Sequence, residues 1–191
     1  MFASVKGGVE GKMVAFSEKG VYHLKKSKGE RTMSMERARA HLARYGLEDR
    51  IQEFDRSSAT VELAAQAVGC APERIAKTLS FRLPGGPLLI VTAGDAKIDN
   101  SKFKGQFHTK AAMLPFEEVE ALVGHGVGGV CPFGVGENVA VYLDVSLKRF
   151  DTVYPAAGTA ASAVRLTPDE LEASSGSLGW IDVCKGWNDC K

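Results

Sequence analysis

The sequence GHGVGGVCPFGVG, residues 124–136, joins an expected helix at 115–123 to an expected strand at 139–144. Glycine reaches backbone angles that other residues avoid, and it lets another group approach the main chain closely. This loop can therefore direct several N–H groups at one acceptor, such as a phosphate, a carboxylate or an ester carbonyl. A flexible connector is the alternative for any glycine-rich loop. His125, Cys131 and the strand that follows directly favour a loop that binds or reacts with a ligand.

The segments around the loop predict a mixture of helices and strands that do not strictly alternate. We expect a first helix at residues 35–46, with Ser34 as its N-cap, because serine accepts a hydrogen bond from the first turn. Further helices are expected at 60–68, at 115–123 and from Thr167, and strands at 51–54, 74–81, 88–93, 139–144, 152–155, 161–166 and 180–183. The strands 152–155 and 161–166 read as a hairpin around Gly158. This order predicts an α+β fold, a curled or barrel-like mixed sheet flanked by helices.

Composition and charge limit the classes of partner. The chain has 24 basic and 23 acidic residues, a net charge of +1, which argues against a protein that coats nucleic acid. No apolar run approaches the ~20 residues that span a bilayer. We therefore expect a cytoplasmic protein with neither DNA nor membrane as a partner. We divide it into a lysine-rich extension at 1–33, containing a possible hairpin, one domain at 34–184, and a frayed tail at 185–191.

Lys77 is unusual within its predicted strand. Side chains alternate faces along a strand, so in RIAKTLSF, residues 74–81, Lys77 shares a face with Ile75, Leu79 and Phe81. Burying an unpaired ammonium costs several kcal/mol, on the order given for buried ions. Lys77 should therefore have a partner, lie in a pocket or take part in chemistry. A lysine that extends its charged end to solvent from the end of a strand is the alternative.

The cysteines and histidines do not predict a metal site. None of the four cysteines forms a C-x-x-C pair, and the four histidines are widely scattered, so we expect neither a metal nor another cofactor. Cys131 and His125, six positions apart in one loop, could act as a nucleophile and its base. Otherwise Cys131 is a small packing residue, and His125 binds a ligand or packs.

Four motifs together resemble the YbaK/EbsC family of aminoacyl-tRNA deacylases. They are IAKTLSF (75–81), GDAKID (94–99), GHGVGGVCPFG (124–134) and YLDVSL (142–147), and the resemblance covers roughly residues 34–183. The family is related to the editing insertion of bacterial prolyl-tRNA synthetase. The resemblance implies a mixed, barrel-like sheet with flanking helices. It also implies hydrolysis of the ester between a wrong amino acid and the 3′ adenosine of a tRNA, often tRNA for proline.

The resemblance also implies roles for individual residues. The lysine of the family falls on Lys77, and its G-x-x-x-P loop falls on Gly128 to Pro132, which would hold the aminoacyl carbonyl. We therefore expect catalytic roles for Lys77, Gly128, Gly129 and Val130, and substrate contacts from His125, Cys131, Pro132 and Phe133. The family generally lacks a protein nucleophile, so water, a ribose hydroxyl or the substrate's own side chain would attack.

Three functions are consistent with the sequence. The first is a freestanding deacylase that removes Cys, Ala or another small residue from tRNA(Pro), with the tRNA acceptor end as partner and a synthetase as a transient one. The second is a regulator that binds a tRNA end or a nucleotide without turnover. The third is a thiol-dependent hydrolase of acyl esters that uses Cys131.

Overall fold

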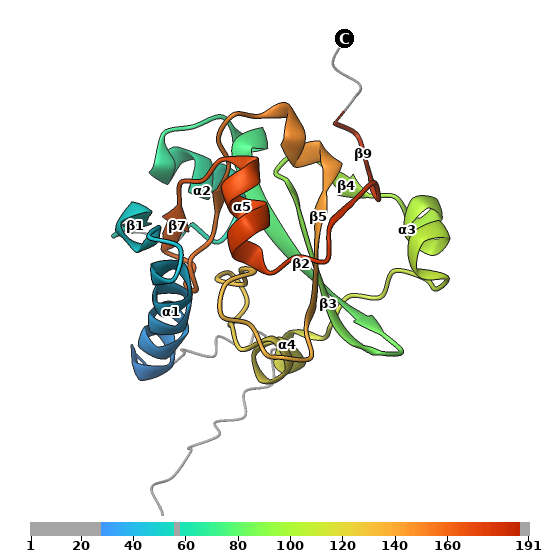
Figure 1. Cartoon of the computed structure of the whole chain (residues 1–191), viewed down its shortest axis with the longest axis horizontal. Coiled ribbons are helices and arrows are strands. Elements are labelled where there is room, and N and C mark those ends of the chain that lie inside the picture. Colours follow the sequence, from blue (N-terminus) through green and yellow to red (C-terminus); the bar gives the residue numbers. More distant parts are fainter. Residues whose placement is uncertain (1–27, 56–57, 188–191) are drawn as a thin grey trace, which may run out of the picture.

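A five-stranded mixed sheet, in the order β6-β2-β3-β5-β8, forms the centre of the computed structural model (Figure 1). The structure describes residues 28–55 and 58–187. Two strand pairs, β1-β7 and β4-β9, lie outside this sheet. The predicted α+β fold, a mixed sheet flanked by helices, is confirmed. The possible hairpin at residues 13–24 lies outside the described residues.

The elements follow one another with short connections. The helices are α1 (Lys28–Ala43), α2 (Val61–Val68), α3 (Asn100–Phe107), α4 (Phe116–Val123) and α5 (Pro168–Ser175), with short 3-10 helices at Glu48–Arg50, Pro72–Arg74 and Val145–Arg149. The strands are β1 (Ile51–Glu53), β2 (Ile75–Leu83), β3 (Gly86–Ala93), β4 (Lys97–Ile98), β5 (Ala140–Asp144), β6 (Tyr154–Pro155), β7 (Ser162–Val164), β8 (Trp180–Ile181) and β9 (Cys184–Lys185).

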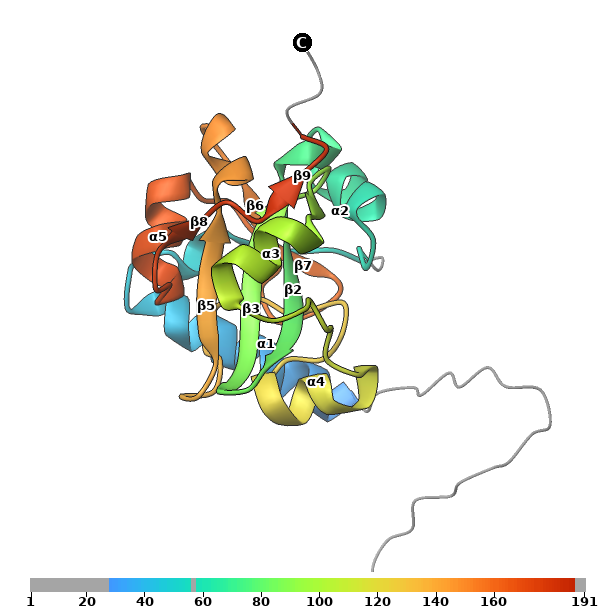
Figure 2. The ribbon, with the colours of Figure 1, turned by 90° about the vertical axis from the view of Figure 1, so that its right-hand side faces the viewer.

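The central strand is β3, as its sequence predicted. β3 pairs antiparallel with β2 and parallel with β5, and Leu88 to Val91 are completely buried. A strand that is covered on both faces needs such a continuous apolar run. Figure 2 shows α3 and β9 in front of β2, β3 and β5, with α1 behind them. On the α3 side, the ring of Phe81 packs against Phe103 with centroids 5.1 Å apart.

Three boundaries differ from the prediction. The first helix begins at Lys28, so Ser34 is not its N-cap: it lies inside α1, 5% exposed, where it bonds to another part of the chain. The segments 152–155 and 161–166 do pair antiparallel as predicted, through the bridges Val153–Leu166 and Ala156–Ala163. What the sequence did not predict is that β6 also joins β2 and β7 also joins β1. Lys185, expected in the frayed tail, belongs to β9. In each case, contacts with residues distant in sequence decide the outcome.

The helix ends follow their local sequences. Thr167 caps α5 by accepting from the N–H of Glu170, and the Glu170 side chain accepts from the N–H of Thr167 in return. Thr60 caps α2 by accepting from the N–H of Leu63, and Gly69 ends that helix in the left-handed conformation. Because these bonds satisfy end groups that the helix itself cannot pair, each cap is worth about 0.5–2 kcal/mol.

Candidate active site

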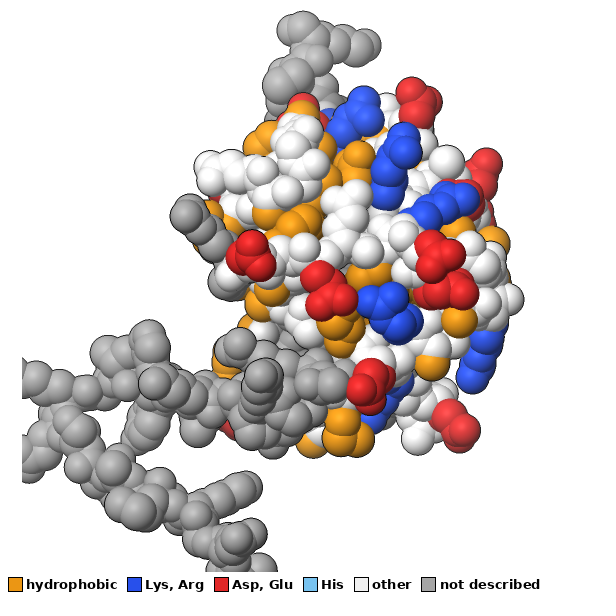
Figure 3. All heavy atoms as spheres, turned by 90° about the vertical axis from the view of Figure 1, so that its left-hand side faces the viewer, with side chains coloured by type: hydrophobic (Ala, Val, Ile, Leu, Met, Phe, Trp, Pro, Cys, Tyr) orange, Lys and Arg blue, Asp and Glu red, His pale blue; other side chains and the backbone are white. Residues whose placement is uncertain are grey.

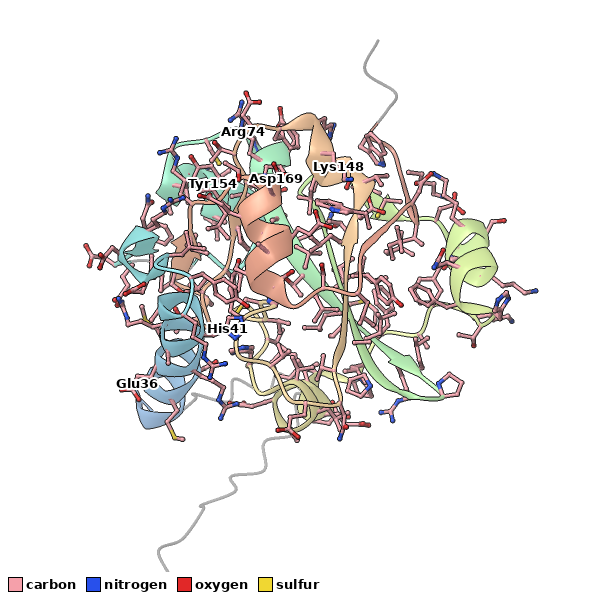
Figure 4. All side chains as sticks on the ribbon, in the orientation of Figure 1. Glu36, His41, Arg74, Lys148, Tyr154 and Asp169 are labelled. Atoms are coloured by element: carbon pink, nitrogen blue, oxygen red, sulfur yellow. The ribbon has the colours of Figure 1, made fainter. Side chains whose placement is uncertain are left out.

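A cavity of about 470 Å³ lies beside β2, next to the glycine loop. Its wall includes the start of α2, most of β2, residues 113–119 around the start of α4, and the glycine loop through Gly128 and Val130. Residues 156 and 162–163 also belong to the lining. Tyr154, labelled in Figure 4, also lines it, from β6. This volume lies within the range typical of small-molecule sites. The cavity therefore joins the two features that the sequence singled out, Lys77 and the glycine loop.

Two backbone amides of the loop are free to bind a ligand. The N–H groups of Gly128 and Val130 have no hydrogen-bond acceptor among the described residues, and both residues line the cavity. The N–H of Gly129, between them, instead donates to the carbonyl of Gly126 at 2.9 Å. Unpaired N–H groups therefore alternate with a paired one along this part of the loop. Gly129 cannot donate to a ligand, but its packing fixes the residues on either side of it.

Close packing against a second loop fixes the glycine loop. A Cβ on Gly129 would lie 2.6 Å from the carbonyl oxygen of Gly158 and 2.6 Å from the Cα of Thr159. Gly128 has φ of 90°, a conformation that favours glycine, and its Cβ would meet Ala160 Cβ at 3.0 Å. These contacts leave no room for a side chain, so glycine is required at both positions.

Lys77 is half-buried and held by two carbonyls. Its Nζ donates to the carbonyl of Gly94 at 2.8 Å and to that of Ala96 at 2.5 Å. Burial lowers the pKa of the Lys77 ammonium, mainly because desolvation penalises the charged form. Lys77 lines the cavity, but these two bonds direct its ammonium to the turn at 94–96 rather than to the loop amides. The partner that the sequence required is therefore a pair of backbone carbonyls.

His125 is completely buried and has a partner at each ring nitrogen. Nε2 lies 2.7 Å from the carbonyl oxygen of Phe133, which can only accept, so Nε2 carries the proton. Nδ1 then accepts from the hydroxyl of Ser34 at 2.8 Å. Burial lowers the pKa of His125, which favours this neutral form. His125 ties α1 to the glycine loop, and it does not line the cavity.

Cys131 is not placed to act as a nucleophile. Its side chain is completely buried outside the cavity wall, and burial raises the pKa of its thiol to about 12. Its Sγ lies 3.6 Å from Nε2 of His125, but that nitrogen already carries a proton and cannot accept another. A reactive cysteine needs thiolate character and access to the substrate. The structure therefore argues against the thiol-dependent hydrolase.

The remaining predicted substrate contacts, Pro132 and Phe133, belong to the buried part of the loop. Pro132 and Phe133 are buried, and neither lines the cavity. The ring of Phe133 packs against His41, with centroids 6.2 Å apart. His41, labelled in Figure 4, lies between α1 and α5, with Nε2 2.7 Å from the carbonyl oxygen of Ser174. The sequence predicted direct contacts for these residues, whereas the structure places them in the core that supports the loop.

Thr78 and Ser80 were missed by the sequence reasoning, although both line the cavity. The hydroxyl of Thr78 is buried and has no hydrogen-bond partner within 28–55 and 58–187. By strand alternation Thr78 and Ser80 share with Ala76 the face of β2 opposite Lys77, and none of the three carries a charge that would mark it within the strand. A small, hydroxyl-bearing strand face beside a glycine loop is the signal that could have found them.

The described residues also bear on metal binding, on membrane spanning and on the charge of one face of the molecule. No group of three His, Cys, Asp or Glu side chains within the described ranges could hold a metal ion. None of the helices in these ranges is long and apolar enough to cross a membrane. Figure 3 shows acidic and basic side chains interspersed over the face that α1, β1 and α2 share, with no continuous basic track on that face.

The architecture and the site define an α+β domain with a cavity lined by one lysine, two residues of the glycine loop with unpaired amides in the described structure, and several hydroxyl-bearing side chains. The family model "Aminoacyl-tRNA editing domain" matches residues 55–173. A relative from Bacillus subtilis, "Uncharacterized protein YwhH", is 54% identical over 156 residues, which cover 81% of this chain and 99% of the relative. The chain belongs to the aminoacyl-tRNA editing domain family.

Two further relatives carry names related to editing. "Putative Cys-tRNA(Pro)/Cys-tRNA(Cys) deacylase EbsC" from Enterococcus faecalis is 27% identical over 149 residues, 77% of this chain and 90% of that protein. A solved structure titled "Crystal structure of a putative trans-editing enzyme for prolyl tRNA synthetase" has a TM-score of 0.73 and 32% sequence identity. It covers 80% of this chain and 98% of its own. The predicted membership of the YbaK/EbsC family is confirmed.

Proposed function

We propose that this protein is a cytoplasmic hydrolase that removes a wrong amino acid from the 3′ end of a mischarged tRNA. Its substrate would be tRNA(Pro) carrying Cys, Ala or another small residue, with a synthetase as a transient partner. The single observation behind the proposal is one cavity lined jointly by Lys77, Gly128 and Val130, where the N–H groups of the two loop residues have no acceptor among the described residues. Residues 34–184 would form the editing domain.

The loop amides would stabilise charge that develops during the reaction. Attack on the ester carbonyl places negative charge on its oxygen, and donors that are already fixed in place lower the barrier. The N–H groups of Gly128 and Val130 would donate to this oxygen. Lys77 would supply positive potential from its anchored position, and its ammonium keeps one N–H beyond the two bonded to Gly94 and Ala96.

The attacking group would come from the solvent or the substrate. None of the described residues that line the cavity is Asp, Glu, His or Cys, so within them no side chain can serve as a general base near neutral pH. Water would add to the carbonyl carbon, the ester C–O bond would break, and the ribose oxygen would leave with the proton that water gives up. If the neighbouring ribose hydroxyl adds first, the acyl group moves to that oxygen and water must still complete the release. If a substrate side chain such as a thiol adds first, the ribose oxygen leaves with the proton of that side chain, and water then opens the cyclic product.

A deacylation assay tests this proposal. tRNA(Pro) charged with Cys, Ala or Ser is incubated with the wild-type protein, Lys77→Ala and Cys131→Ala. We expect turnover by the wild type, strong loss in Lys77→Ala and retention in Cys131→Ala. Tight binding without turnover of any ester would instead indicate a regulator. Loss in Cys131→Ala alone would restore the thiol route and contradict the proposed mechanism.

A further inference from the structure

The outer edge of β2 is covered at both ends and open between them. At its start, Ile75 and Ala76 pair with β6. Further along, the N–H of Leu114 donates to the carbonyl of Ser80, and the N–H of Arg82 donates to the carbonyl of Ala112. The cavity lies along the uncovered part of the strand, between these two contacts.

Thr78 is the residue whose backbone faces this opening. Along a strand, the N–H and C=O of one residue point to the same side, and successive residues alternate sides. Ser80 and Arg82 direct their backbone groups away from β3, so Thr78 does the same. No hydrogen bond is recorded from the outward N–H or to the outward C=O of Thr78 within the described chain.

The side chain of Thr78 supports the same assignment. Its Oγ1 is buried without a partner inside the described structure, which costs about 1–3 kcal/mol for a polar group. Two other hydroxyls of the wall are paired: Ser58 Oγ donates to the carbonyl of Ala160, and Ser162 Oγ lies 2.9 Å from Oγ1 of Thr159. Thr78 therefore combines an unpaired hydroxyl, donor and acceptor on one wall of the cavity.

We propose that Thr78 binds the aminoacyl group as a one-residue β-bridge. An extended amino acid also presents its nitrogen and its carbonyl to one side, so two facing residues can exchange both hydrogen bonds. The substrate's α-ammonium donates to the carbonyl of Thr78, and its ester carbonyl accepts from the N–H of Thr78. The ester carbonyl oxygen has two lone pairs, so one loop amide can bind it together with the N–H of Thr78. The oxyanion that forms on attack has three lone pairs and can accept from Thr78 and from both loop amides.

The described lining residues include no acid, which favours a neutral acceptor for the substrate's ammonium group. The carbonyl of Thr78 is such an acceptor. The bridge binds the amino group and the carbonyl that all amino acids share. The substrate side chain would contact the other residues of the cavity wall. The substrate class is therefore esters with a free α-amino group. This inference rests on the proposed function.

The test compares esters that differ only in the amino group. Alanyl-tRNA(Pro) is paired with propionyl-tRNA(Pro), and cysteinyl-tRNA(Pro) with 3-mercaptopropionyl-tRNA(Pro), each enzymatic rate being divided by the uncatalysed rate of the same ester. Because a hydrogen bond to a charged group is lost, we expect a preference of about 10- to 100-fold for the aminoacyl ester. Equal acceleration of both members would overturn the bridge while leaving the deacylase intact. If the protein accelerates the hydrolysis of none of the four esters, the proposed function itself is overturned.

Two variants distinguish the contribution of the Thr78 backbone to binding from that of its hydroxyl. Thr78→Val removes only the hydroxyl, so the preference for esters with an α-amino group should persist. If that preference is lost in Thr78→Val, the side chain and not the backbone holds the amine, and the backbone bridge is overturned. Thr78→Pro removes an N–H that makes no ladder bond, as edge strands tolerate. It should slow both esters at least 10-fold and keep the preference, because the carbonyl of residue 78 remains. If Thr78→Pro does not fold, the paired esters still decide the question.

Discussion

Replacing Gly129 with alanine tests whether packing between two loops shapes the cavity. The new Cβ would lie 2.6 Å from the carbonyl oxygen of Gly158 and 2.6 Å from the Cα of Thr159. Both are backbone atoms, so no side chain can rotate away. The φ of Gly129 lies outside the left-handed region that favours glycine, so packing alone determines the cost. The loops must separate by several tenths of an ångström or more.

Overpacking of this kind destabilises a protein by typically about 1–3 kcal/mol. For a domain of this size each kcal/mol lowers Tm by roughly 2–4 °C. The control is Gly105→Ala within α3, where a new Cβ would have no atom within 4 Å. Alanine in a helix interior is favoured over glycine by about 0.5–1 kcal/mol, so this variant should melt slightly above the wild type. Thermal unfolding followed by circular dichroism measures both.

The same variant has a consequence for activity. Gly129 lies between Gly128 and Val130, which line the cavity and carry the proposed donors, so moving it would displace both. We expect the deacylation rate of Gly129→Ala to fall at least ~10-fold below that of Gly105→Ala, since misplaced donors stabilise the developing charge poorly. A Tm equal to that of the control would refute the packing argument. A lowered Tm with full activity would show that the contact stabilises the fold without positioning the amides.

Three further predictions concern single side chains. At pH 8 the Cys131 thiol, with a pKa of about 12, is only about 10⁻⁴ ionised. Iodoacetamide should therefore modify it at least ~1,000-fold more slowly than free cysteine, and labelling at the free rate would contradict the burial. Burial lowers the pKa of His125 in the fold, so the free energy of unfolding should decrease as pH falls below about 6.5. His125→Asn should flatten this dependence between pH 7 and 5, whereas His108→Asn on the surface should not. Lys77→Met should reduce kcat by about 10²- to 10³-fold, and the exposed Lys104→Met should leave it unchanged.

The parts of the fold that depend on local chemistry could be predicted from the sequence. Thr167, Pro168 and Glu170 predicted the start of α5, and the structure has the reciprocal hydrogen bonds of that motif. The apolar run 88–93 predicted the central strand because only a strand covered on both faces needs so many large side chains. Each signal lies within a few residues of the structure that it specifies.

The parts that depend on distant partners could not be predicted. Ser34 looked like a helix cap because serine favours that position, but its hydroxyl bonds to His125, 91 residues away. The role of Thr78 follows from which segments cover the edge of β2, and no local pattern states this. The cavity also needs six separate segments to meet, so the sequence could name Lys77 and the loop without showing what lies between them.

The glycine loop takes its shape from neighbours far along the chain in both directions. Ser34 in α1 holds His125, and a Cβ on Gly134 would lie 2.8 Å from the carbonyl oxygen of Arg37, so the helix also presses on the end of the loop. Residues 124–136 transplanted into another scaffold would carry the letters of the motif without its conformation. A successful graft would have to bring α1 and the segment around Gly158 with it.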